Sequence, residues 1–185
     1  EGKFVVLFAG TMGMQQGLDS ILEAASLCAQ TFPDARFVLA GGGTEKERLA
    51  QKAVDRKIGN VIFLPFRPPA AMGDVFGLAD ALLVHLKDDP VFNVWIPGKT
   101  QALLAMGKPI LMGVKGDAAS LVKESGGGVC FSPSNRESLS TTVIELMKMT
   151  PDELAAMGGR GSSYYGKHLA FEVAIKKIER IVESV

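Results

Sequence analysis

The sequence predicts an α/β fold: a doubly wound parallel sheet of about six strands with helices on both faces. Short apolar runs alternate with segments of helical spacing along the chain. The apolar runs are nearly continuous, which is typical of parallel strands that are buried on both faces. Loops rich in glycine or proline follow most of these runs. Because a repeated β-α-β order places consecutive strands in one parallel sheet, we expect a single domain over residues 1–185.

The predicted elements follow one another in a regular order. Apolar runs predict strands at residues 3–9, 36–40, 60–64, 81–86, 109–114 and 128–132. Apolar residues at helical spacing predict helices at residues 18–31, 44–56, 70–78, 100–106, 117–125, 134–148, from 150 onward and at 170–182. We expect the last two helices to form a pair that packs apart from the sheet.

Three Ser/Thr-x-x-Glu motifs are expected to start helices as capping boxes. The motifs are Thr44–Glu47, Ser134–Glu137 and Thr150–Glu153. In a capping box, the hydroxyl and the carboxylate each accept a hydrogen bond from the other residue's backbone N–H. Pro151 follows Thr150 and occupies the first helical position, which proline prefers.

The composition argues against several classes of protein. Lys and Arg number 20, as do Asp and Glu, so the formal net charge is zero and nothing indicates a nucleic-acid partner. No apolar run approaches the ~18 residues of a membrane span. Cys28 and Cys130 are expected to be buried free thiols, which fits a reducing, cytoplasmic compartment. No His, Cys, Asp and Glu residues have metal-ligand spacing, so we expect no metal site.

The stretch 88–112, DDPVFNVWIPGKTQALLAMGKPILM, organises the chain. It joins two predicted strands and holds Lys99 at or near the first turn of a helix. A lysine there adds a charge to free backbone N–H groups and to the positive end of the helix dipole. This combination suits a phosphate or pyrophosphate, and a solvated surface lysine is the alternative interpretation.

Four loops are expected to converge on one crevice, because each follows a strand of the same sheet. They span residues 10–17, 41–43, 66–67 and 97–99. The first reads G-x-x-G-x-x-x-G, which differs from the dinucleotide fingerprint and from the P-loop. Ala40 and Gly41 stand where a dinucleotide site needs an acid for the ribose. The sequence therefore disfavours nicotinamide or flavin enzymes and P-loop NTPases.

Six segments carry a resemblance to a known family: GTMGMQQGLDSILEAA, FVLAGGGTEKERL, NVIFLPFRP, ADALLVHL, IPGKTQALLAMGKPIL and GGGVCFSPSNRESL. In this order they resemble glycosyltransferase family 4, the glycosyl transferases group 1. The string I-P-G-K-T-Q-A-x-L-A-x-G-K-P-I is the specific part, and it is most similar to the L-fucosamine transferase branch. The resemblance implies the Rossmann-like, C-terminal nucleotide-sugar-binding domain of a two-domain GT-B enzyme. It implies a retaining hexosyltransferase that uses a UDP-linked donor in cell-surface polysaccharide or glycan synthesis.

The resemblance also implies which residues contact the nucleotide sugar. The first glycine loop passes close to the diphosphate, and the loop after the third strand frames the base through its backbone. The segment before the G-K-P turn holds the ribose and the diphosphate. The implied contacts are Gly10, Thr11, Gly13, Gln16, Gly17, Gly42, Phe66, Arg67, Pro97, Gly98, Lys99, Thr100 and Gln101.

The chain departs from the family pattern at two charged sites. The family often has Arg and Lys in the first loop, where this chain has Thr11 and Gln16. We therefore expect Lys99 to carry more of the phosphate charge. The family often has two glutamates before the G-K-P turn, where this chain has Val94 and Ala102. These changes bear on catalysis and on activity itself.

Other residues are expected to replace the contacts of the two glutamates. Gln101 is the candidate for the ribose, and Asp88 or Asp89 for the sugar. Lys99, Asp88 and Asp89 are therefore the candidate catalytic residues. We expect no cofactor bound by the protein, because Lys99 and backbone N–H groups would stabilise the leaving diphosphate without a metal.

Two other functions stay open at this point. A GT-B-type sugar-nucleotide epimerase would need carboxylates and histidines in the crevice, and only His85, Asp88 and Asp89 are candidates. His85 is otherwise a hydrogen-bonded structural residue. A non-catalytic interaction module would bind a partner through Trp95 and the Met12–Met14 loop.

The first residues enter a strand directly and lack an initiator Met. We therefore expect a longer enzyme whose N-terminal domain binds the acceptor, and a fragment that is inactive alone. Apolar surface should be exposed around Met12, Met14 and Trp95, where the other domain would lie. Peripheral association of the full-length enzyme with the cytoplasmic face of the membrane is compatible with this reading.

Overall fold

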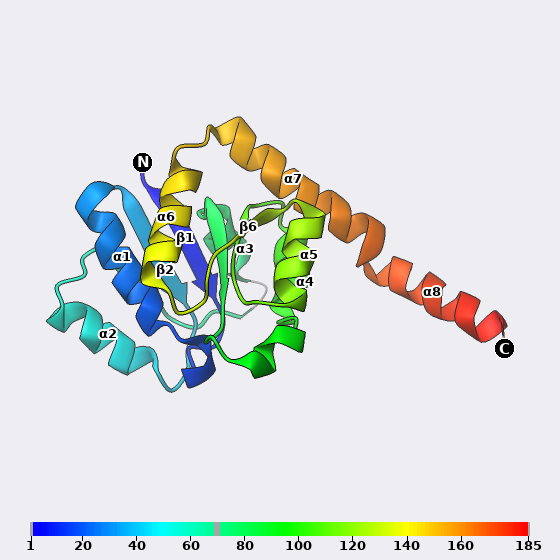
Figure 1. The fold of residues 1–185 in the computed structure, drawn as a ribbon, viewed down its shortest axis with the longest axis horizontal. Helices are drawn as coiled ribbons and strands as arrows, with labels where there is room; N and C mark the ends of the chain where they lie inside the picture. Colours follow the sequence, from blue (N-terminus) through cyan, green and yellow to red (C-terminus); the bar gives the residue numbers. More distant parts are fainter. Residues whose placement is uncertain (1, 69–70, 185) are drawn as a thin grey trace.

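The described part of the chain forms one parallel sheet of six strands in the order β3-β2-β1-β4-β5-β6 (Figure 1). The computed structural model describes residues 2–68 and 71–184. The strands are β1 (Phe4–Ala9), β2 (Ala35–Ala40), β3 (Val61–Leu64), β4 (Ala81–His85), β5 (Ile110–Gly113) and β6 (Gly128–Cys130). The predicted fold class and all the predicted strands are confirmed, with small differences at the strand ends.

The direction in which the sheet grows reverses between β1 and β4. β1 pairs with β2 along its whole length and pairs with β4 on its other side. From β1 the chain runs outward to β3, returns to the centre at β4 and then runs outward to β6. In such a sheet the two sets of connections diverge, so a crevice opens beyond the carboxyl ends of β1 and β4.

Helices cover both faces of the sheet. They are α1 (Asp19–Thr31), α2 (Lys46–Asp55), α3 (Gly73–Gly77), α4 (Lys99–Ala105), α5 (Asp117–Ser125), α6 (Arg136–Met147), α7 (Pro151–His168) and α8 (Phe171–Glu183), with 3-10 turns η1 (Met14–Gln16) and η3 (Pro90–Val94). α1, α2 and α6 share one core with Phe8 and Phe37. α3, α4 and α5 share the core on the other face with Leu7 and Leu82. This two-sided burial explains why the strands are almost entirely apolar, with Arg36 and His85 as the charged or ionisable exceptions.

α7 packs backbone against backbone on the turns that precede β5 and β6. A Cβ atom on Gly158 would lie 2.0 Å from the carbonyl oxygen of Gly107. A Cβ atom on Gly127 would lie 2.5 Å from the Cα of Gly161. The glycines of α7 therefore permit a close approach that larger residues would prevent.

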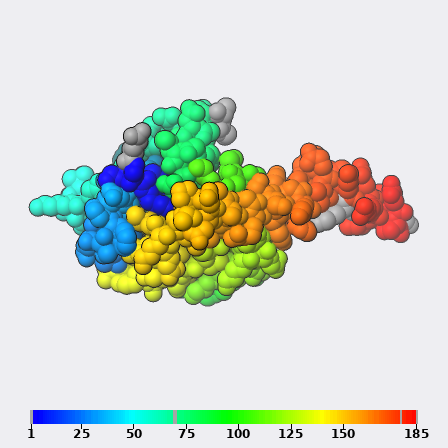
Figure 2. Space-filling view, turned by 90° about the horizontal axis from the view of Figure 1, so that it is seen from above, coloured from blue at the N-terminus to red at the C-terminus, as the bar shows by residue number. Residues whose placement is uncertain are grey.

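α8 extends away from the body of the domain (Figures 1 and 2). Phe171, Ile178, Ile181 and Val182 of this helix are exposed. The expectation that the C-terminal pair packs apart from the sheet is right for α8 and wrong for α7, because Met157 of α7 joins the core. No helix in the described ranges is long and apolar enough to cross a membrane.

One of the three predicted capping boxes forms. The Thr150 hydroxyl accepts a hydrogen bond from the N–H of Glu153, whose carboxylate accepts one from the N–H of Thr150. The box at Thr44 is wrong, because α2 begins later, at Lys46, without a side-chain cap. The entry to α2 is held instead by tertiary contact: the N–H of Glu45 donates to the carbonyl of Met12.

The box predicted at Ser134 is also wrong. α6 is capped by Asn135, whose side-chain oxygen accepts a hydrogen bond from the N–H of Ser138. Ser134 has a φ of 57° and lies before the cap. Its N–H donates to His85 and its hydroxyl accepts from the N–H of Asp88, so it joins two loops at the crevice.

The predicted short helix at 70–78 is confirmed as α3, which starts later than expected, at Gly73. Ala70 lies outside the described residues. Lys99 is the first residue of α4, as predicted.

Candidate functional site

Two adjoining pockets open at the carboxyl edge of the sheet. The first, the β4 pocket, holds about 320 Å³ between the loops that follow β1 and β4, and its lining includes Gln15, His85, Phe92 and Trp95. The second, the β2 pocket, holds about 580 Å³ beside the loops that follow β1, β2 and β3, and its mainly apolar lining includes Met72, Phe76, Leu103 and Met106. Gly10, Thr11 and Lys99 line both pockets, so the two form one continuous crevice.

A third hollow, of about 580 Å³, lies at the opposite edge of the sheet. Its charged groups all have partners in the protein. Lys3 pairs with Asp34, the Asp80 carboxylate accepts from the N–H of Val5, and Lys108 donates to the carbonyl of Ala79. These groups hold the chain together and leave the carboxyl-edge crevice as the better candidate.

Lys99 lies at the junction of the two pockets. Its Nζ lies 3.4 Å from the carbonyl oxygen of Ala9 and 3.9 Å from the centre of the Phe8 ring. Burial lowers the pKa of Lys99 to about 8, and no described carboxylate offsets this shift. The junction therefore suits an anion.

Two glycine loops in backbone contact form the floor of the β2 pocket. Gly41 has a φ of 143°, and a Cβ atom there would lie 2.0 Å from the carbonyl oxygen of Gly10. Gly43 has a φ of 134°, and its Cβ would lie 2.4 Å from the carbonyl oxygen of Met12. A Cβ atom on Gly42 would meet nothing within 4 Å. The fold requires Gly41 and Gly43, whereas the absence of a side chain at Gly42 leaves room in the pocket.

His85 is a structural residue beside the β4 pocket. Its side chain is buried and stacks on Phe131. Its Nε2 accepts a hydrogen bond from the N–H of Ser134, so its Nδ1 carries the proton and donates to the carbonyl of Gln16 at 2.6 Å. Burial lowers the pKa of His85 to about 4. A neutral imidazole therefore ties the loop after β1 to the loop after β6 and has no free nitrogen for acid–base chemistry.

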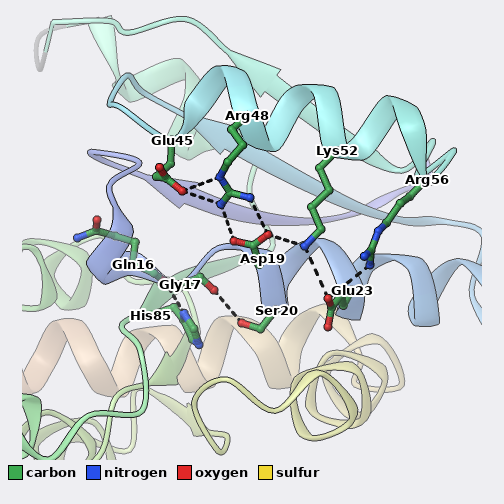
Figure 3. A network of polar contacts seen from close by, with 10 residues as sticks. All are labelled: Gln16, Gly17, Asp19, Ser20, Glu23, Glu45, Arg48, Lys52, Arg56 and His85. Atoms are coloured by element: carbon green, nitrogen blue, oxygen red, sulfur yellow. Dashed lines mark hydrogen bonds and ion pairs between the residues drawn. The ribbon is translucent and has the colours of Figure 1, made fainter.

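An ion network fixes α1 against α2 (Figure 3). Asp19, the first residue of α1, accepts hydrogen bonds from both terminal nitrogens of Arg48, at 3.0 and 2.6 Å, and pairs with Lys52. These contacts, Arg48 first, hold the pKa of the Asp19 carboxyl well below its usual range. Glu23, one turn further along α1, pairs with Lys52 and Arg56. α1 and α2 each follow a glycine loop of the crevice, and the network joins these two helices through side chains that line neither pocket.

Most of the predicted site residues line the crevice. They are Gly10, Thr11, Gln16, Gly42, Phe66, Arg67, Pro97, Gly98 and Lys99. Gln16 also supports its own loop, because its side-chain oxygen accepts from the N–H of Gly13 at 3.0 Å.

Four predicted contacts lie outside the lining of both pockets. Gly13 and Gly17 line a small hollow beside α2. Thr100 is fully buried, and Gln101 is exposed on α4. The family resemblance implied that all four lie near a phosphate or ribose, but the direction in which α4 and the first loop turn moves them away from both pockets.

The two aspartates proposed for the sugar lie outside both pockets. Asp88 pairs with Lys115 at 2.8 Å. The carboxylate of Asp89 accepts from the N–H of Val91 and caps η3. Among the described residues, no carboxylate lines either pocket and no cluster could hold a metal.

The positions of the missing glutamates differ in their surroundings. Ala102 lines the β2 pocket, whereas Val94 is 80% exposed and lies outside both pockets.

The expectation that Met12 lies at the surface is wrong. Met12 is fully buried, because its backbone packs under Gly43. Met14 and Trp95 are exposed as expected.

Sequence reasoning missed several residues of the lining. Gln15 lies in the β4 pocket, and Met72, Phe76 and Met106 lie in the β2 pocket. The one-turn spacing of Met72 and Phe76 in front of β4 was a readable signal for an apolar wall. Gln15 carried no such signal, because it lies between the glycines of a loop.

The comparisons with known proteins decide the family. The family profile described as glycosyl transferases group 1 matches residues 1–162. The chain belongs to this family. A Pseudomonas aeruginosa protein named probable glycosyltransferase WbjE is 26% identical over 189 aligned residues, which cover 100% of this chain and 45% of that protein. The chain thus spans about half the length of the curated relatives it matches.

Solved structures share the fold at low sequence identity. Anabaena Alr3699/HepE in complex with UDP and glucose matches with a TM-score of 0.80 and 18% identity, over 100% of this chain and 49% of that chain. The C-terminal domain of LpcC, a glycosyl transferase group 1 protein of Francisella tularensis, matches with a TM-score of 0.73 and 16% identity, over 92% of this chain and 88% of that chain. At these identities the likeness establishes the Rossmann-like fold alone.

Proposed function

We propose that this chain is the donor-binding domain of a retaining glycosyltransferase of the hexosyltransferase type. Its donor would be a UDP-linked sugar used in cell-surface polysaccharide or glycan synthesis. The observation that carries the proposal is the position of Lys99, a half-buried residue whose ammonium is desolvated at the junction of two pockets. Burying an ammonium group without a counter-charge costs free energy, and a diphosphate at the junction would offset that cost.

The two pockets match the parts of a nucleotide sugar. The mainly apolar β2 pocket suits the flat base and the ribose, and the junction suits the diphosphate. The β4 pocket then receives the sugar, where Trp95 offers an aromatic surface. The UDP complex of Anabaena HepE supports the choice of UDP.

The chemistry follows from this arrangement. The bond between the sugar C1 and the β-phosphate oxygen breaks, and its electron pair stays on that oxygen. A bond between C1 and the oxygen of the acceptor hydroxyl forms, and the hydroxyl proton passes to the leaving diphosphate. Negative charge develops on the leaving diphosphate, and Lys99 would stabilise it together with backbone N–H groups. The proposal needs no metal or other cofactor held by the protein.

The domain would be the C-terminal half of a longer enzyme. The LpcC structure, which matches over most of its length, is a C-terminal domain and supports this placement. An N-terminal domain would then bring the acceptor to the crevice. The overall sequence resemblance is our reason for proposing the L-fucosamine transferase branch. Peripheral association with the cytoplasmic face of the membrane belongs to the same proposal.

The epimerase alternative is not favoured. Both ring nitrogens of His85 are hydrogen-bonded, and Asp88 and Asp89 lie outside the pockets. Among the residues that the structure describes, the crevice therefore offers no free carboxylate and imidazole pair to remove and return a proton.

Calorimetric titration of the chain with UDP, GDP, ADP and uridine tests the donor site. Lys99→Ala should weaken UDP binding by ~1.5–3 kcal/mol, the range for a hydrogen bond to a charged group, and barely change uridine binding. Lys176→Ala, at an exposed position on α8, is the control and should change neither. The proposal is wrong if no diphosphate binds at millimolar concentration, or if Lys99→Ala weakens uridine and UDP equally.

The chain alone should transfer no sugar, because nothing would position an acceptor. Positioning can supply ~7–11 kcal/mol of the barrier reduction, and losing half of that abolishes measurable turnover. The test compares the chain with a longer protein, using UDP-sugars and lipid-linked acceptors. Equal rates would contradict the two-domain proposal.

A further inference from the structure

Lys46 holds the ends of two neighbouring strands together. Its Nζ donates to the carbonyl of Gly41, at 2.9 Å, and to the carbonyl of Leu64, at 2.7 Å. Gly41 follows β2, and Leu64 is the last residue of β3. Each of these residues leads directly into a loop that lines the β2 pocket, at Gly41–Gly43 and Phe66–Arg67. The side chain therefore connects the two loops from behind the pocket.

The helix itself does not explain a lysine at this position. Lys46 is the first residue of α2, where the helix dipole disfavours a cation. An ammonium has three donors, and carbonyl oxygens occupy two of them here. Lys46 lines neither the β2 pocket nor the β4 pocket, so it does not contact a phosphate in the crevice. Its contacts indicate a role in holding the backbone.

The β2 pocket has few polar side chains with which to distinguish one base from another. Among the described lining residues they are Thr11, Lys99 and Arg67. Thr11 and Lys99 belong to the junction with the β4 pocket. Discrimination between bases then depends on Arg67, which itself belongs to the second loop, and on the backbone N–H and C=O groups of the two loops and their spacing. Hydrogen bonds are sensitive to distance and angle, so a small shift of one loop against the other would blur this discrimination.

We propose that Lys46 is a positioning residue that sets base selectivity by fixing the loop at Gly41–Gly43 relative to the loop at Phe66–Arg67. This inference rests on the proposed function, since it takes the β2 pocket to be the base site. It assigns Lys46 and Lys99 different effects. Lys99 acts on the diphosphate whatever the base, whereas Lys46 acts on the choice of base.

The experiment measures the ratio of the dissociation constants for ADP and UDP, by calorimetry on the 185-residue chain. Lys46→Met should lower this ratio about tenfold, the equivalent of about 1.4 kcal/mol. Lys46→Arg should keep most of the ratio, because its guanidinium can reach both carbonyls. The amide of Gln in Lys46→Gln can donate to one of the two carbonyls, so this variant should give an intermediate ratio. It keeps the inference testable if the methionine variant does not fold.

Lys52→Met is the matched control, because Lys52 lies on the same helix and also anchors it, through Asp19 and Glu23. It should lower thermal stability and leave the ratio unchanged. An unchanged ratio in the Lys46→Met and Lys46→Gln variants, or an equal loss in Lys52→Met, would overturn the inference. Failure of the unmodified chain to bind any diphosphate would instead overturn the donor-site proposal, and this inference with it.

Discussion

Replacing Lys99 with methionine should make the unliganded chain more stable while it removes most of the affinity for diphosphate. Methionine keeps the length of the aliphatic stem and removes the charge. In the folded chain this charge is buried beside the ring of Phe8, with a single long contact to the carbonyl of Ala9. A group that we propose binds an anion would thus lower the stability of the unliganded chain.

The pKa of Lys99 gives the size and the sign of this effect. The pKa is lowered from 10.5 to about 8 by burial. Between these values the unfolded chain holds a proton that the folded chain has lost, so the free energy of unfolding rises as the pH rises through this window. The full shift corresponds to about 3 kcal/mol at 25 °C. Because methionine also loses the contacts to Ala9 and Phe8, we expect a net gain of about 1–3 kcal/mol at pH 7.

Urea unfolding at pH 7 and at several values between pH 8 and 10.5 measures both parts of this prediction. The unmodified chain should gain stability across the upper range, and Lys99→Met should lack that gain. Lys176→Met, at an exposed position on α8, should behave like the unmodified chain. If Lys99→Met is less stable at pH 7, or if its stability follows the same pH dependence, then the buried charge is not costly and the argument fails.

Three further predictions concern the frame of the site. Gly158→Ala should lower the free energy of unfolding by about 1–3 kcal/mol, because its Cβ would meet the Gly107 carbonyl. Gly159→Ala is the control and should raise the free energy of unfolding slightly, because a Cβ there meets open space. Equal effects of the two substitutions would contradict the packing of α7. The pKa of His85 is lowered to about 4, so the unfolded chain binds a proton between pH 6.5 and 4 that the folded chain does not. The free energy of unfolding should therefore fall by up to about 3 kcal/mol as the pH drops through this range. Urea unfolding of His85→Gln should show a smaller fall. Thr150→Ala should cost about 0.5–2 kcal/mol in denaturant unfolding, and an unchanged midpoint would show that the capping box contributes nothing.

The fold could be predicted because its strands are buried on both faces. A continuous apolar run such as residues 81–86 can be assigned to a buried strand without knowing which strands it pairs with. Few environments other than the interior of a parallel sheet tolerate such a run. Helix starts were harder. The motif at Thr150 forms its box, but at α6 the cap is Asn135. The hydroxyl of Ser134 accepts a hydrogen bond from the N–H of Asp88 instead, and its N–H donates to His85. The local rule fails where a contact distant in sequence takes up the capping group.

The position of Lys99 could be predicted from its place after β4, because parallel strands end at one edge of the sheet. The burial of Met12 could not be predicted from the sequence, because it depends on the packing of Gly43 against the Met12 backbone. The hydrogen bonds of Lys46 to the ends of two strands could not be predicted from the sequence either, because they depend on the pairing of β2 with β3.

Two of the departures from the family's charged residues in this crevice are related: the alanine on α4 and the uncharged residues of the first loop. Ala102 lies one helical turn after Lys99, and both line the β2 pocket. A glutamate at this position, as the family often has, would lie within reach of Lys99 and pair with it. With alanine there, the ammonium keeps no described carboxylate partner. The first loop has meanwhile Thr11 and Gln16 where the family often has cations. Under the proposed function, the lysine on α4 that lacks an acidic partner would supply the charge to the diphosphate that the first loop does not supply.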